Sequence, residues 1–123
     1  MKPIFACCVL FSALLLSFNS SSDQRDAHEG TITNLYDAFG KDTTLIKDFG
    51  FSCITQYHGK TILFDAGSNA DIFKKNTSKL GIDLRQIDIV IVSHGHFDHL
   101  NGLDYVLKVN PKVKIYFPYD IFW

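Results

Sequence analysis

The fold is decided by the stretch Ser-His-Gly-His-Phe-Asp-His at residues 93–99. It holds three of the chain's five histidines, His94, His96 and His99, together with Asp98. At the chain's own composition, the pattern His-x-His-x-Asp-His would arise by chance in fewer than roughly 0.1% of chains of this length. Imidazole nitrogens and a carboxylate suit zinc, and also iron or manganese. The stretch therefore predicts a metal site.

The spacing within this stretch supports a metal site with more than one ion. His94 and His96 are two residues apart at the end of an extended strand, so both rings point to one side. Gly95 between them lets the backbone bend without a side-chain clash. Asp98 and His99 enter the first turn of the next helix, where the helix N-terminus favours a carboxylate. Four ligands in one segment can serve two adjacent metals, which can hold a bridging hydroxide as nucleophile.

Alternating strands and helices are predicted on both sides of the cluster. Residues 49–57 and 61–65 pair as a hairpin through the turn at 58–60. Residues 88–93 contain an unbroken apolar run at 89–92, which predicts an inner strand buried on both faces. Ser68, followed three residues later by Asp71, predicts the N-cap of a helix that Gly81 ends. The predicted strands lie at residues 31–36, 49–57, 61–65, 88–93 and 112–117, and the predicted helices at residues 69–80 and 98–110.

Three segments resemble the metallo-β-lactamase-fold hydrolases. Ser-His-Gly-His-Phe-Asp-His-Leu-Asn-Gly-Leu at residues 93–103 is similar to the signature of that superfamily, and Leu-Phe-Asp-Ala-Gly at 63–67 resembles its upstream strand-end motif. Residues 80–94 look most like the branch of ribofuranosylaminobenzene-phosphate (dihydropterin-type) synthases. The resemblance implies an α+β fold, the αββα sandwich. Residues 31–123 would supply its N-terminal half, in the order β, β-hairpin, α, β, α, β.

The resemblance also assigns roles to individual residues. His94 and His96 would ligate a first metal, and Asp98 and His99 a second, with Asp98 also positioning the attacking water. The metals would be two zinc ions, with iron or manganese as alternatives. Asp65 would orient the metal-binding loop through hydrogen bonds, although a plain turn or cap residue is the other interpretation. A metal-bound hydroxide would then attack a phosphoester, lactone, thioester or amide carbonyl of a small-molecule substrate.

The match to the superfamily stops after the first half of its site. The family completes its ligand set from a second half, whereas this sequence has no histidine after His99. We therefore expect a truncated domain with an incomplete site, inactive by itself. Two alternatives stay open beside the hydrolase. One is a non-catalytic half-domain that needs a partner or the missing C-terminal half, and the other is an iron-dependent redox enzyme of the same fold.

The N-terminal residues predict export. Lys2 is followed by an apolar run over residues 4–16 and a small polar exit, which together indicate a signal peptide over residues 1–22. Residues 23–30 form a polar linker. The protein would be secreted or periplasmic, without stable membrane association after cleavage, or membrane-anchored if uncleaved. The net charge of −1 gives no electrostatic reason to expect a nucleic-acid partner.

Overall fold

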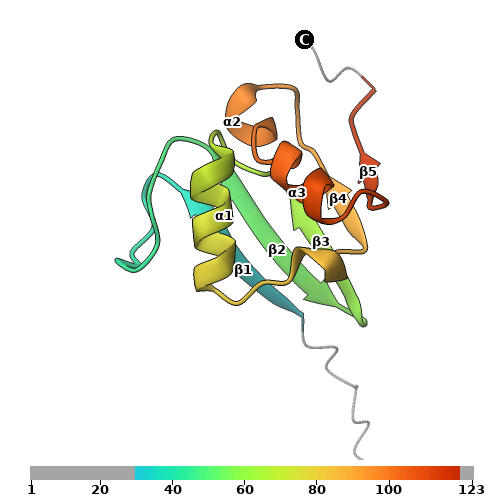
Figure 1. The fold of residues 1–123 in the computed structure, drawn as a ribbon, viewed down its shortest axis with the longest axis horizontal. Coiled ribbons are helices and arrows are strands. Elements are labelled where there is room, and N and C mark those ends of the chain that lie inside the picture. Colours follow the sequence, from blue (N-terminus) through green and yellow to red (C-terminus); the bar gives the residue numbers. More distant parts are fainter. Residues whose placement is uncertain (1–29, 120–123) are drawn as a thin grey trace, which may run out of the picture.

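The computed structural model describes residues 30–119 (Figure 1). The predicted signal peptide, and the predicted linker except for Gly30, lie outside these residues. Within them, no helix has the length and apolar character needed to cross a membrane. The elements are β1 (Thr31–Asp37), β2 (Phe51–Tyr57), β3 (Lys60–Phe64), α1 (Ala70–Lys79), a 3-10 turn (Leu84–Gln86), β4 (Ile89–Ile91), α2 (Phe97–Leu100), α3 (Leu103–Val109) and β5 (Lys114–Tyr116).

The five strands form one mixed sheet in the order β1-β2-β3-β4-β5. β1, β2 and β3 are antiparallel neighbours, which confirms the predicted hairpin, whereas β3, β4 and β5 run parallel. Because parallel strands end at the same edge of a sheet, the residues that follow β3 and β4 meet there. Asp65 and Ser93 occupy these two positions, at the edge where open α/β sheets bind their ligands.

The core lies between the sheet and the helices. Ile54, Leu63 and Val90 are register partners across β2, β3 and β4, and each is 3% exposed or less. Phe73 of α1 and Val106 of α3 are fully buried in the same cluster. Figure 1 shows α1 and α3 over one face of the sheet. The sequence therefore stabilises this half of the fold by burying one apolar face.

The predicted burial of residues 88–93 on both faces is wrong for the described part of the chain. Val90 and Val92 are buried, but Ile89 and Ile91 on the opposite face are only half-buried. None of the described helices covers that face. The strand is also shorter than predicted: β4 begins at Ile89, and the side chain of Asp88 before it binds Lys60 and the Thr61 N–H. At the other end, the Ser93 N–H donates to a side chain instead of the sheet.

The predicted N-cap of α1 is wrong by one residue. Asn69 caps the helix, and its side-chain oxygen accepts hydrogen bonds from the N–H groups of Asp71 and Ile72. The hydroxyl of Ser68, the residue before it, instead donates to Asp48 at 2.9 Å. Gly81 follows the helix end with a φ of 68°, as predicted.

The predicted helix over residues 98–110 is split into α2 and α3. The His99 carbonyl accepts from the Ala66 N–H at 2.8 Å, so it is not used in a continuous helix. Gly102 sits at the break, where an added Cβ would lie 2.0 Å from the Ala66 carbonyl oxygen. The loop after β3 thus packs directly against the segment that carries the histidines.

Candidate metal centre

Three of the predicted ligands converge on one point. His94, His96 and Asp98 each offer one ligand atom, and these atoms all lie within 4.8 Å of one another. His94 and His96 lie in the loop after β4, and Asp98 lies in the first turn of α2. His94 and Asp98 are half-buried while His96 is exposed, so the group opens to solvent. A small-molecule ligand could therefore reach it.

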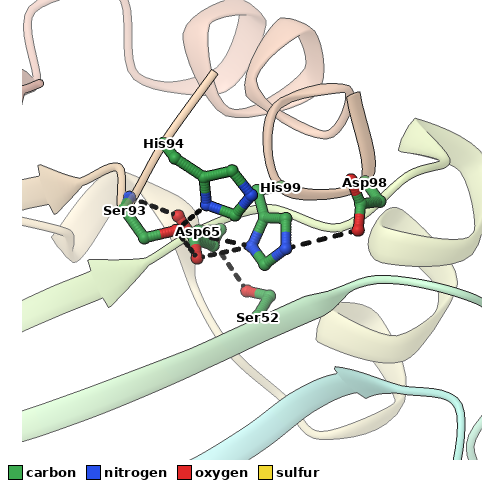
Figure 2. A network of polar contacts seen from close by, with 6 residues as sticks. All are labelled: Ser52, Asp65, Ser93, His94, Asp98 and His99. Atoms are coloured by element: carbon green, nitrogen blue, oxygen red, sulfur yellow. Dashed lines mark hydrogen bonds and ion pairs between the residues drawn. The ribbon is translucent and has the colours of Figure 1, made fainter. Parts of the chain in front are cut away.

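Asp65 lies beneath this group and is buried (Figure 2). One carboxylate oxygen accepts from the Ser93 N–H at 2.7 Å. The other accepts from the Ser93 hydroxyl and from His99 Nδ1, each at 2.7 Å. The Asp65 backbone has a φ of 55°, which costs on the order of 1–3 kcal/mol for a residue other than glycine. The Ser52 hydroxyl, which donates to the Asp65 carbonyl at 2.8 Å, helps to hold this conformation.

This carboxylate orients two histidine rings. The Nδ1–H of His99 donates to Asp65 directly, so in the neutral ring the lone pair lies on Nε2. The Ser93 hydroxyl donates to Asp65 and so accepts from the Nδ1–H of His94, at 2.8 Å. In the neutral His94 ring the lone pair likewise lies on Nε2. Protein metal sites use this arrangement to fix the tautomer and the direction of a histidine ligand.

The donor set fits a cation. His99 Nε2 lies 3.3 Å from Asp98 Oδ2, and the rings of His94 and His99 are 4.1 Å apart. Two lone pairs that face each other at this distance repel unless a positive charge lies between them. Either a proton on the nitrogen or a metal ion supplies that charge. The three nitrogens and the carboxylate are ligands that zinc, iron and manganese accept.

All five predicted site residues therefore lie in one region. His94, His96 and Asp98 form the tightest group, whereas His99 lies beside them between two carboxylates. Asp65 does not cap α1, and its carboxylate contacts Ser93 and His99 instead. These are the contacts expected of a residue that orients the metal-binding loop. The division of the four ligands between two metals stays a prediction.

Ser93 has a role that sequence reasoning missed. Its backbone and hydroxyl both bind Asp65, and its hydroxyl also contacts His94. The sequence signal was its position at the end of an apolar strand, directly before the first histidine. The role depends on Asp65, which is 28 residues away and is brought near only by the parallel pairing of β3 and β4.

A second polar cluster, also missed, fixes the loop that precedes β2. The Tyr36 hydroxyl donates to Asp48 at 2.6 Å and lies 2.8 Å from the Ser68 hydroxyl. Burial and the neighbouring Asp48 carboxylate raise the pKa of Tyr36 to about 12. The hydrogen bond from Tyr36, with those from the Phe49 N–H and Ser68, lowers the pKa of Asp48. The cluster thus ties β1, the loop before β2 and the loop after β3 together.

Fold and site together define a metal-binding α+β domain with its ligands at the carboxyl ends of parallel strands. The chain belongs to the metallo-beta-lactamase superfamily, whose sequence model matches residues 46–123. This superfamily includes metal-dependent hydrolases, and its members typically bind metal ions. The predicted family and the predicted α+β fold are thereby confirmed.

Three curated relatives each match just over half of the chain. The uncharacterized protein MJ0448 of Methanocaldococcus jannaschii is 39% identical over 79 residues, covering 58% of this chain and 30% of that protein. The 7,8-dihydropterin-6-methyl-4-(beta-D-ribofuranosyl)-aminobenzene-5'-phosphate synthase of the same organism is 39% identical over 64 residues, covering 51% and 22%. The endoribonuclease ysh1 of Aspergillus fumigatus is 41% identical over 75 residues, covering 56% and 8%. The chain thus spans less than a third of the length of each relative.

Among solved structures, the Rm3 metallo-beta-lactamase is similar with a TM-score of 0.48 and 22% identity, covering 65% of this chain and 30% of that one. The synthase relative agrees with the resemblance noted for residues 80–94. The endoribonuclease relative leaves the predicted exclusion of nucleic acid without support.

Proposed function

We propose that this chain carries metal ligands and the attacking-water site of a metal-dependent hydrolase. The observation that carries the proposal is the convergence of His94, His96 and Asp98 within 4.8 Å. The superfamily includes hydrolases, and one relative is named an endoribonuclease. We infer a substrate with a phosphoester, lactone, thioester or amide group, and the phosphoester class includes the phosphodiester of a nucleic acid.

Each residue of the site has a defined part in this proposal. His94 and His96 would hold one zinc ion through nitrogen, and Asp98 and His99 a second. Bound zinc lowers the pKa of its water toward neutrality and polarises the substrate oxygen. Asp98 accepts a hydrogen bond from the attacking water and aligns it with the substrate. Asp65 keeps the histidine rings in place and does not touch the substrate, because it is buried beneath them.

Hydrolysis assays on the zinc-loaded full chain test the proposal. The substrates would be one chromogenic compound of each class: a phosphodiester, a lactone, a thioester and an amide. We expect turnover of at least one, and a loss of about 100-fold or more in kcat/KM for His96→Ala and Asp98→Ala. Asp104→Ala, on the exposed side of α3, is the matched control. Equal turnover in wild type, His96→Ala and Asp98→Ala would contradict the proposal.

The open face of the sheet favours one second candidate, a non-catalytic half-domain. Ile32 is 75% exposed and Tyr116 is 56% exposed on that face. A further protein layer there, from a partner or from more of the same polypeptide, would complete a sandwich. In that case the chain alone would bind zinc and hydrolyse none of the four substrates. Turnover that His96→Ala abolishes would exclude this candidate.

We also propose that residues 1–22 direct export and are then removed. The apolar run over residues 4–16 after a single basic residue supports this. The intact mass of the protein in its own organism tests it. A mature N-terminus at Asp23 is expected, and a chain that keeps Lys2 would contradict cleavage.

A further inference from the structure

Two exposed phenylalanine rings lie against each other at the rim of the candidate metal centre. Phe49 is 63% exposed and Phe97 is 60% exposed. Their ring centroids are 6.4 Å apart and the rings are tilted by 44°. Single exposed apolar residues are common on protein surfaces, so neither ring alone is informative. The informative feature is that the two rings pair although they are 48 residues apart in the sequence, and that one of them lies between two candidate ligands.

The position of Phe97 relative to the metal ligands is set by the chain. It lies between His96 and Asp98, both of which belong to the group of converging ligand atoms. α2 begins at Phe97, and the preceding His96 is the extended residue before it. The Phe97 side chain therefore leaves the backbone within one residue of two candidate ligands. Phe97 is thus an exposed apolar residue directly between two candidate ligands in the sequence.

Phe49 is held against the same helix by its neighbours. Gly50 has a φ of 129°, and an added Cβ there would lie 2.3 Å from the Asp98 carbonyl oxygen. On the other side, Asp48 accepts the hydrogen bonds of Tyr36 and Ser68. The backbone on both sides of Phe49 is thus anchored while its ring points to solvent. Binding at Phe49 would therefore require little ordering of the backbone.

We propose that Phe49 and Phe97 form a platform for a planar aromatic group of the ligand held at the metal centre. The proposal rests on the proposed hydrolase and names its substrate class: an anionic or acyl group that reaches the metal, joined to an aryl ring or a nucleobase. Tilted rings about 6 Å apart give such a group one stacked and one edge contact. The metal-binding residues would hold the reacting group of the substrate, and the two phenylalanine rings would select the aromatic group attached to it.

The test compares two inert ligands that differ only in the aromatic group. Phenylphosphonate and methylphosphonate present the same anion to the metal, and their carbon–phosphorus bonds are not hydrolysed. Dissociation constants would be measured by NMR titration of the zinc-loaded full chain. We expect wild type to prefer phenylphosphonate by about fivefold to tenfold, which is the scale of aromatic contacts. Phe49→Ala and Phe97→Ala should each lower the preference, and the double variant should abolish it.

The variants also separate this proposal from the hydrolase proposal. Phe39→Ala, which removes a ring that is 91% exposed in the loop after β1, should keep the full preference. Methylphosphonate affinity should stay unchanged in all three ring variants. Suppose that methylphosphonate binds. If wild type then shows no preference for phenylphosphonate, or if the double variant keeps that preference, the platform is refuted while the metal site stands. If the chain takes up no zinc, both proposals fail together.

Discussion

At the scale of single residues, Asp65 contacts the candidate site without belonging to the group of converging ligand atoms. Its carboxylate binds His99 directly and His94 through the hydroxyl of Ser93. A neutral amide cannot accept from all three donors in the same way, because one of its two terminal atoms is itself a donor. Both rings would then lose the partner that fixes their tautomer.

Asp65→Asn should therefore weaken zinc binding by about 10-fold to 100-fold, the usual effect of losing a residue that orients a metal ligand. Competition with a chromophoric chelator measures the affinity. Asp104→Asn is the matched control, and circular dichroism checks that the variant folds. A folded Asp65→Asn protein with wild-type affinity would show that this carboxylate does not orient the ligands.

Tyr36 gives a prediction that is independent of metal. Its folded pKa is about 12 against an ordinary value of 10.0. Since the unfolded chain loses this proton first, the stability that Tyr36 contributes is complete below pH 10 and is lost as the pH rises through 12. Absorbance at 295 nm should show a tyrosinate step near pH 12, and Tyr36→Phe should remove that step. A step near pH 12 that persists in Tyr36→Phe would contradict the assignment.

At the scale of elements, close backbone contacts place the metal-binding loop. The loop after β3 donates to the His99 carbonyl, and Gly102 lies against that same loop. These contacts explain why α2 and α3 are separate helices. The apolar periodicity over residues 100–107 predicted one helix, because a contact with a loop 36 residues earlier leaves no periodic signal. The N-cap of α1 was predicted one residue too early, at Ser68. The Ser68 hydroxyl instead binds Asp48, another contact between residues distant in sequence that leaves no periodic signal.

Gly102→Ala tests the close approach. The new methyl group would lie 2.0 Å from a backbone oxygen that cannot rotate away. We expect a loss of about 1–3 kcal/mol in the free energy of unfolding, as for other overpacked sites. Urea denaturation measures it. Gly40→Ala is the control, because nothing lies within 4 Å of its added Cβ. Equal stability of the two variants would contradict the tight packing described here.

At the scale of the whole molecule, the mixed sheet brings the motif at residues 93–99 next to Asp65, which lies far from it in the sequence. The cluster at residues 93–99 was predictable because its ligands are adjacent in sequence and rare by chance. The hairpin was predictable from its turn and its two strand-like runs. The contact of Asp65 with Ser93 was not, because it depends on parallel pairing that composition and periodicity do not encode. Only the family resemblance pointed to Asp65.

The uncovered sheet face is the other feature that appears only in the whole molecule. The apolar run over residues 89–92 correctly indicated an inner strand, since β4 lies between β3 and β5. Its second apolar face lacks a cover among the described residues, so Ile89 and Ile91 stay half-buried. Sequence periodicity reports which faces are apolar, but it does not report whether the layer that covers them is present.

The most direct test of the account is the zinc content of the full chain after dialysis against a known free zinc concentration, measured by native mass spectrometry. We expect at least one zinc ion bound per wild-type chain, and none in His94→Ala or His96→Ala, because each removes a nitrogen from the converging group. His58→Asn, in the turn between β2 and β3, should bind as wild type does. A wild-type chain that holds no more zinc than His96→Ala would contradict the metal centre.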